Sequence, residues 1–134
     1  KLNIKPLRQS DYASIQHVDN SIILCGIHLN SQMHSGHEEI RKDRIRRIVQ
    51  DVIECEKSKS TNNTIIVGDF NVPPYDDSCI SAMCFYAQPI YEEAIKRSRI
   101  VDRVKRFMFY NPMWNLLGDF NKPYGTYYYS NKNM

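Results

Sequence analysis

Two segments of the chain carry the same four residues, Gly-Asp-Phe-Asn, at positions 68–71 and 118–121. A carboxylate and an amide two residues apart suit the hydrolysis of a phosphate ester. The carboxylate can orient or deprotonate a water molecule, or bind a metal ion. The amide can donate hydrogen bonds to a phosphoryl oxygen as charge develops on it. Each copy is therefore a candidate site.

The first copy follows a segment that is typical of a buried strand. Residues 64–67 are Thr-Ile-Ile-Val, all β-branched, and they lead directly into Gly68 and Asp69. A strand here would place Asp69 and Asn71 just beyond its carboxyl end, where α/β folds bind their ligands. Gly68 permits close approach of the backbone. The simpler alternative is that Asp69 and Asn71 only begin a turn.

The second copy has no such strand before it. It lies within residues 111–125, NPMWNLLGDFNKPYG, a segment rich in turn-forming residues. We interpret Asp119 and Asn121 as parts of a turn rather than of a site.

An amphipathic helix separates two segments that are predicted to be strands. Residues 21–29 (SIILCGIHL) and 64–70 (TIIVGDF) have the composition of strands buried on both faces. Between them, apolar residues recur at helical spacing, at Ile45, Ile48, Val49, Val52 and Ile53. Strand, helix and strand at this spacing predict a βαβ unit with parallel strands that are neighbours or nearly so.

His28 lies at the end of the first predicted strand. Because parallel strands end at the same edge of a sheet, we expect His28 to lie beside Asp69 and Asn71. An imidazole there could contact a phosphate or act as an acid. A purely structural role for a histidine at the end of a strand is the alternative.

The flanking elements are expected to be short. Residues 2–9 read as a strand interrupted by Pro6, and residues 76–87 as a short helix capped by Asp77 or Ser78. Residues 89–107 are predicted to form a second helix with proline at its first position. Ser35 and Glu38 have the spacing of a capping box at the start of the central helix.

The composition is that of one soluble globular domain. The chain has 134 residues, with 42% hydrophobic and 25% charged residues. It contains no apolar run near the ~20 residues that a membrane helix needs, and no signal peptide is visible, which favours a cytoplasmic location. The net charge of +3 permits an acidic partner without arguing for one. The four cysteines have no CxxC spacing and are predicted to be reduced core thiols.

Three further features have modest explanations. The basic run at residues 41–47 (RKDRIRR) could contact a nucleic acid, but a solvated helix surface is the simpler interpretation, and Arg41 or Arg44 could brace the site. His34 and His37 lack the supporting spacing of a metal site. Residues 126–129 (TYYY) could stack on bases, although the alternating faces of a strand explain them as well.

The segments IHLNS (residues 27–31) and IIVGDFNVPP (residues 65–74), joined by a basic amphipathic helix, resemble the endonuclease/exonuclease/phosphatase superfamily of DNase I-like enzymes. The similarity extends over most of the chain from Ser21 onward. It implies an α/β fold that is part of a four-layer sandwich, with a mixed sheet and flanking helices. It also implies metal-dependent attack of water on a phosphoester, with Mg²⁺ as the cofactor and Mn²⁺ as the alternative.

The resemblance assigns a role to each of three residues. His28 matches the histidine that contacts phosphate, and Asp69 matches the aspartate that orients or deprotonates the attacking water. Asp69 is also the tentative metal ligand. Asn71 matches the asparagine that binds phosphate and stabilises the phosphoryl transition state.

Other parts of the family pattern have no counterpart here. Family members carry an Asn and a metal-binding Glu on their first strands and a Ser-Asp-His motif near their end. Residues 1–134 therefore resemble the central portion of a single partial domain, and we expect the isolated chain neither to bind Mg²⁺ tightly nor to turn over.

For the parent protein we expect a phosphoesterase, most simply a nuclease, that acts on nucleic acid or another phosphodiester. The alternative is a non-catalytic relic of the fold that binds a phosphate-bearing ligand or a protein partner. The sequence leaves the substrate and the oligomeric state open.

Overall fold

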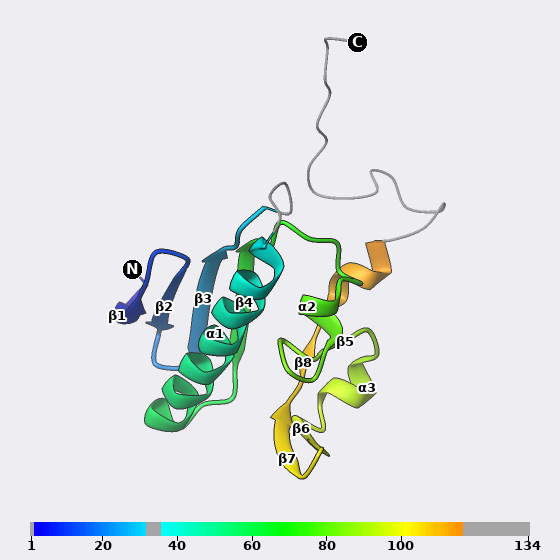
Figure 1. Ribbon diagram of the computed structural model, residues 1–134. Helices are drawn as coiled ribbons and strands as arrows, with labels where there is room; N and C mark the ends of the chain where they lie inside the picture. The colour runs from blue at the N-terminus through cyan, green and yellow to red at the C-terminus, as the bar shows by residue number, and fades with distance from the viewer. Residues whose placement is uncertain (1, 32–35, 117–134) are drawn as a thin grey trace.

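A computed structural model of the chain describes residues 2–31 and 36–116 (Figure 1). Its centre is a four-stranded mixed sheet in the order β1-β2-β3-β4. The strands are β1 (Ile4–Gln9), β2 (Ala13–Val18), β3 (Ile22–His28) and β4 (Thr64–Asp69). β1, β2 and β3 pair antiparallel in succession, whereas β3 and β4 are parallel. The predicted α/β class and βαβ unit are confirmed.

One long helix, α1 (His37–Lys59), covers one face of this sheet (Figure 1). Its apolar side chains Ile45, Ile48 and Val52 are at most 1% exposed and belong to the same core cluster as Ile23 and Cys25 of β3. The packing of α1 thus buries one face of β3. The βαβ crossover also places β3 and β4 parallel to one another, so that they end at the same edge of the sheet.

The start of α1 differs from the prediction. Gly36 is the N-cap residue, with a φ of 86°, and no side-chain cap hydrogen bond is made. The expected capping box of Ser35 and Glu38 falls partly outside the described residues, because Ser35 is not among them. The C-cap residue of α1 is Ser60, which has a left-handed conformation. Its backbone N–H donates to the carbonyl oxygens of Glu56 and Lys57.

The opposite face of the sheet is open among the described residues. Burial in β3 alternates, with Ile23, Cys25 and Ile27 buried and the residues between them less so. On β4 the side chains of Ile65 and Val67 are 52% and 53% exposed. Within residues 2–31 and 36–116, β3 and β4 are covered on the α1 face only, so the expected burial on both faces is not seen among these residues.

The remaining described elements form a smaller group beside β4 (Figure 1). They are α2 (Asp77–Ile80), β5 (Ala87–Gln88), α3 (Tyr91–Ala94), β6 (Ser98–Val101), β7 (Val104–Phe107), β8 (Phe109–Tyr110) and the 3₁₀ helix η1 (Pro112–Leu116). Aromatic rings join this group to the sheet: Phe85 lies 5.6 Å from Phe70 and 6.4 Å from Phe109, measured between ring centroids.

The long helix predicted for residues 89–107 was wrong. Only Tyr91–Ala94 is helical, and β6 and β7 form an antiparallel hairpin. Asp102 and Arg103 have φ values of 49° and 63°. Two successive residues with positive φ make a tight hairpin turn, and the β-branched Ile100, Val101 and Val104 suit the strands on either side.

Other predictions stand as follows. β1 is a strand with a register shift between Pro6 and Arg8, as the proline suggested. The short helix predicted for residues 76–87 covers only Asp77–Ile80, and its N-cap is Asp76 rather than Asp77 or Ser78. All four cysteines are buried and free, which confirms core thiols. Among the described residues, no helix has the length and apolar character to span a membrane. Asp119, Asn121, His34 and residues 126–129 lie outside the described part of the chain.

Candidate functional site

His28 and Asp69 are direct partners across the parallel pairing of β3 and β4. Neighbouring strands are about 4.8 Å apart, and side chains alternate between faces along each strand. Cys25 and Ile66, three pairs earlier, both face the core, so His28 and Asp69 both face the open side. Both are exposed. The sequence-predicted imidazole and carboxylate therefore lie side by side at the carboxyl edge of the sheet.

Gly68 makes this edge possible. It has a φ of 143°, and a Cβ atom at this position would lie 2.0 Å from the carbonyl oxygen of Ile27. Only glycine tolerates this combination of dihedral angle and close approach. Residue 68 thus brings the end of β4 tightly against β3 immediately before Asp69.

Asn71 closes a turn over the end of the sheet. Its backbone N–H donates to Oδ1 of Asp69 at 2.9 Å, and its φ is 54°. Its side-chain Nδ2 donates to the carbonyl oxygen of Leu29 at 2.8 Å. The backbone N–H of Leu29 in turn donates to the carbonyl oxygen of Asp69 at 2.9 Å. Asn71 therefore lies with its side chain against the loop that follows His28.

These hydrogen bonds leave part of each side chain for chemistry. A carboxylate has two oxygens, so the second oxygen of Asp69 can accept a proton or orient a water molecule. An amide nitrogen carries two hydrogens, so one N–H of Asn71 can still donate to a phosphoryl oxygen. The turn-forming role and the chemical role are compatible in this geometry.

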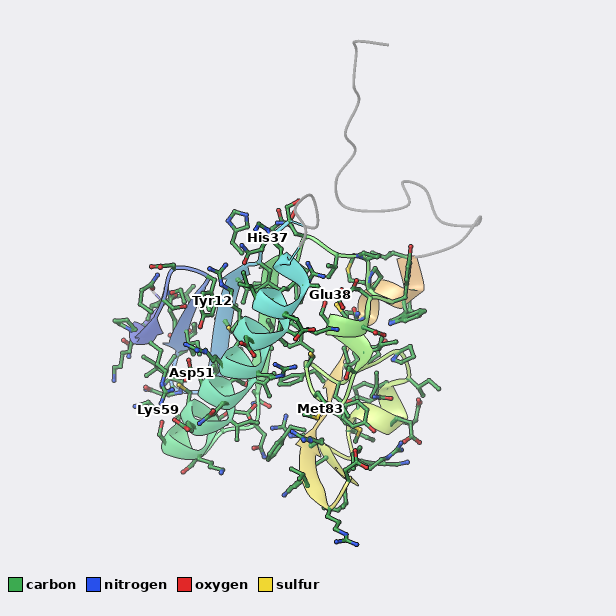
Figure 2. All side chains as sticks on the ribbon, viewed as in Figure 1. Tyr12, His37, Glu38, Asp51, Lys59 and Met83 are labelled. Atoms are coloured by element: carbon green, nitrogen blue, oxygen red, sulfur yellow. The ribbon has the colours of Figure 1, made fainter. Side chains whose placement is uncertain are left out.

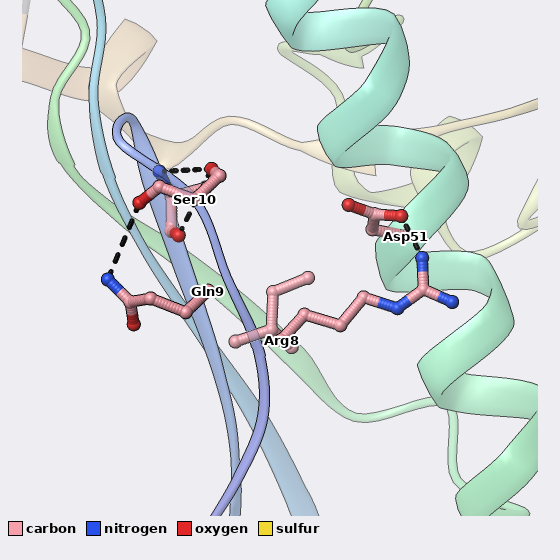
Figure 3. Close-up of a pocket in the computed structure, with 6 residues that line it drawn as sticks. Arg8, Gln9, Ser10 and Asp51 are labelled. Carbon is pink, nitrogen blue, oxygen red and sulfur yellow. Dashed lines mark hydrogen bonds and ion pairs between the residues drawn. The ribbon is translucent and has the colours of Figure 1, made fainter.

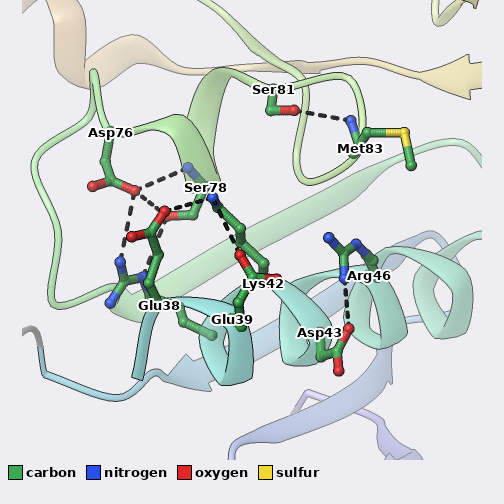
Figure 4. A network of polar contacts seen from close by, with 10 residues as sticks. Glu38, Glu39, Lys42, Asp43, Arg46, Asp76, Ser78, Ser81 and Met83 are labelled. Atoms are coloured by element: carbon green, nitrogen blue, oxygen red, sulfur yellow. Dashed lines mark hydrogen bonds and ion pairs between the residues drawn. The ribbon is translucent and has the colours of Figure 1, made fainter. Parts of the chain in front are cut away.

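The loop after β4 is anchored at its far end by Asp76. The carboxylate of Asp76 accepts hydrogen bonds from the backbone and hydroxyl of Ser78, as Figure 4 shows. It also lies 3.9 Å from Nη2 of Arg41. Burial by itself would raise the pKa of Asp76, but the Ser78 hydrogen bonds and the charges of Arg41 and Lys42 outweigh it and lower that pKa.

The loop after β3 is contacted by helix α1, which also carries Arg41. Arg44 donates to Oδ1 of Asn30, and its guanidinium lies 4.9 Å from the centre of the Tyr12 ring. The carbonyl oxygen of Tyr12 accepts the backbone N–H of His28 at 3.0 Å. In Figure 2, Tyr12 and His37 lie toward the end of α1 opposite to Lys59.

The contribution of β2 to this edge was not predicted from the sequence. Tyr12 precedes residues Ala13–Val18, whose apolar and polar side chains alternate as in a half-buried strand. The following Asp19 and Asn20, both with positive φ, are the turn residues of a hairpin into β3. That alternation, followed by an Asp-Asn pair, was the signal that could have found β2.

The described residues at this edge do not by themselves fit a magnesium ion. Mg²⁺ takes six oxygen ligands, usually with one or two carboxylates and the rest waters or substrate oxygens. Asp69 is the one carboxylate of the GDFN turn. Among residues 2–31 and 36–116, no group of three or more His, Cys, Asp and Glu side chains could hold a metal ion.

One cavity lies apart from this edge. A small cavity of about 260 Å³ is lined by Arg8, Gln9, Ser10 and Asp51, between the β1–β2 hairpin and α1 (Figure 3). It contains none of the three predicted site residues. The basic run of α1 is largely ion-paired, with Lys42 bonded to Glu38 and Arg46 to Asp43 (Figure 4). These pairs favour a solvated helix surface over a nucleic-acid contact.

Comparison of the chain with protein-family models, with curated proteins and with solved structures found no match.

Proposed function

We propose that this chain carries the phosphate-contacting residues of a metal-dependent phosphoesterase, most simply a nuclease or phosphodiesterase. The observation that supports the proposal best is the pairing of His28 with Asp69 at the carboxyl edge of two parallel strands. The side chain of Asn71 reaches the same edge through Leu29. An imidazole, a carboxylate and an amide on one rim are groups that can act as acid, base and hydrogen-bond donor in phosphoester hydrolysis.

Each side chain would have one task. Asp69 would orient a water molecule for in-line attack and take its proton on the oxygen that the turn leaves unused. Asn71 would donate its second N–H to a phosphoryl oxygen as negative charge grows there. The exposed His28 would donate to another phosphoryl oxygen or protonate the leaving group.

The open face of the sheet supports the layered architecture that belongs to this proposal. Ile4, Ile65 and Val67 expose about half of their surface on that face, and such a face is stable when a second sheet packs on it at about 10 Å. We propose a four-layer α/β sandwich in which a second sheet packs on this face.

A second candidate function is binding without turnover. The internal hydrogen bonds of Asp69 and Asn71 would serve a structural turn equally well. A relic of the fold could then hold a phosphate-bearing ligand through His28 and Asn71 without hydrolysing it.

The test is hydrolysis of a chromogenic phosphodiester, and of single- and double-stranded nucleic acid, by the intact protein with Mg²⁺ or Mn²⁺. Asp69→Asn keeps the acceptor that the turn needs but removes the charge, and should lower kcat/KM about 100-fold or more with an unchanged melting temperature. Asp102→Asn, the same change at an exposed turn with positive φ, is the matched control. Near-normal hydrolysis by Asp69→Asn would overturn the assigned role, and binding without hydrolysis by the wild type would favour the second candidate.

A further inference from the structure

Two arginines, one turn apart on α1, hold different loops. Arg41 contacts Asp76 and Ser78 at the far end of the loop after β4. Arg44 contacts Asn30, two residues after His28, and the ring of Tyr12, a residue whose backbone is hydrogen-bonded to His28. On a helix, residues three apart lie on neighbouring positions of one face. One face of α1 therefore reaches both loops that carry the candidate site.

The contacts of Arg41 are unusual for a stabilising ion pair. Arg41 is only 2% exposed. Its Nε lies 3.4 Å from the Ser78 hydroxyl, and its Nη2 lies 3.9 Å from the Asp76 carboxylate. Its Nη1 is buried without a hydrogen-bond partner among the described residues. A buried cation with a spare donor and long contacts is costly to keep, and an apolar side chain would fill the same space more cheaply. Core packing therefore does not account for an arginine here.

Arg44 contacts the loop that follows β3. It is half-buried, donates to the Asn30 side chain and stacks on the Tyr12 ring. Arg44 thus contacts Asn30, two residues after His28, and Tyr12, whose carbonyl oxygen accepts the backbone N–H of His28. It can fix where His28 stands but has no contact with its reactive atoms.

We propose that Arg41 and Arg44 are positioning residues of the candidate phosphoester site, Arg41 for the loop of Asp69 and Asn71 and Arg44 for the loop of His28. This inference rests on the proposed function for its catalytic meaning, since the positioned groups are those assigned above. The two loops meet at the hydrogen bond between Asn71 and Leu29. A register error of either loop would misplace one group relative to the other, and errors near 1 Å are costly to turnover.

The experiment compares Arg41→Met, Arg44→Met and the control Arg46→Met in the intact protein by hydrogen–deuterium exchange. Arg46 lies on the same helix and forms an exposed ion pair with Asp43. Arg41→Met should accelerate exchange about tenfold in residues 71–79 but not in residues 28–31, and Arg44→Met should do the reverse. Arg46→Met should change neither segment.

Kinetics supply the second readout. Both loop variants should lower kcat more than they raise KM, because positioning acts in the transition state. Arg41→Lys, which keeps the charge beside Asp76, should recover part of the lost kcat, and it also serves if Arg41→Met does not fold. Unchanged exchange in both loops, or changed exchange with an unaltered kcat, would overturn the inference.

Failure of the proposed function looks different. An intact wild-type protein that hydrolyses no phosphoester overturns the enzyme proposal and with it the catalytic half of this inference. The crossed exchange pattern would then still decide whether each arginine holds its own loop.

Discussion

A Cβ atom on Gly68 would lie 2.0 Å from the carbonyl oxygen of Ile27, its partner across β3 and β4. No side chain fits there without moving one strand, and the φ of 143° adds strain for any other residue. The junction of β4 with the GDFN turn therefore accepts only glycine at residue 68.

Gly68→Ala should destabilise the protein by about 2 kcal/mol or more, because both the clash and the dihedral angle oppose alanine. Gly26→Ala is the matched control, since a Cβ atom at Gly26 meets nothing within 4 Å. It should change stability by less than about 1 kcal/mol. Urea unfolding of both variants measures the difference. Equal stability of the two would show that the close approach to Ile27 does not exist.

Arg97 should contribute more to stability than its neighbour Arg99. Glu56 is 5% exposed and accepts from Arg97 at 2.6 Å and from Thr64 at 2.6 Å. Arg97→Met leaves that buried carboxylate short of a partner and should cost about 2 kcal/mol. Arg99→Met breaks only an exposed pair with Glu93 and should cost less than about 1 kcal/mol. Thermal unfolding distinguishes them, and a smaller loss for Arg97→Met would contradict the buried pairing.

The Asp76 carboxylate should make folding depend on pH under acidic conditions. Its pKa is lowered in the folded state, so its contribution to stability is present above the unfolded pKa, near pH 4, and is lost as the pH falls through the folded pKa. Asp76→Asn retains a good N-cap but removes the charge beside Arg41. The variant should be less stable than wild type at pH 7, and the difference should shrink below about pH 4. A difference that is independent of pH would contradict this assignment.

The four buried thiols should resist alkylation while the chain is folded. Burial raises the pKa of Cys25 and of Cys79 to about 12, and it also raises the pKa of Cys55 and Cys84. The thiolate, which is the reactive form, is therefore scarce at pH 8. Mass spectrometry after iodoacetamide treatment should show little labelling of native protein and complete labelling in denaturant. Rapid labelling of native protein would contradict the buried positions.

The central βαβ unit could be predicted because its signals are local and strong. Runs of β-branched residues flank a helix whose apolar positions recur with helical spacing. The side on which β4 stays open could not be read in the same way. Ile65 and Val67 are apolar like Ile66, and only the packing of α1 on one face leaves the first two half exposed.

The smaller group of elements was harder to predict. Ile90, Ala94, Val101 and Val104 offer a partial helical spacing, but positive φ at Asp102 and Arg103 turns the chain into a hairpin. Arg and Asp rarely signal such turns as strongly as Gly or Asn.

The βαβ topology predicted which edge holds His28, Asp69 and Asn71. The arginine contacts depend on side-chain reach across α1, and spacing alone did not assign Arg41 and Arg44 to their loops.

The most direct test is a double-mutant cycle on kcat/KM for a phosphodiester in the intact protein, with His28→Ala, Asp69→Asn and both together. Groups that act on one phosphoryl group are strongly non-additive. Each single variant should lose about 100-fold or more in kcat/KM. The kcat/KM of the double variant should remain within about tenfold of that of the less active single variant. Fully multiplicative losses, or near-normal turnover by either single variant, would show that His28 and Asp69 do not work on the same bond.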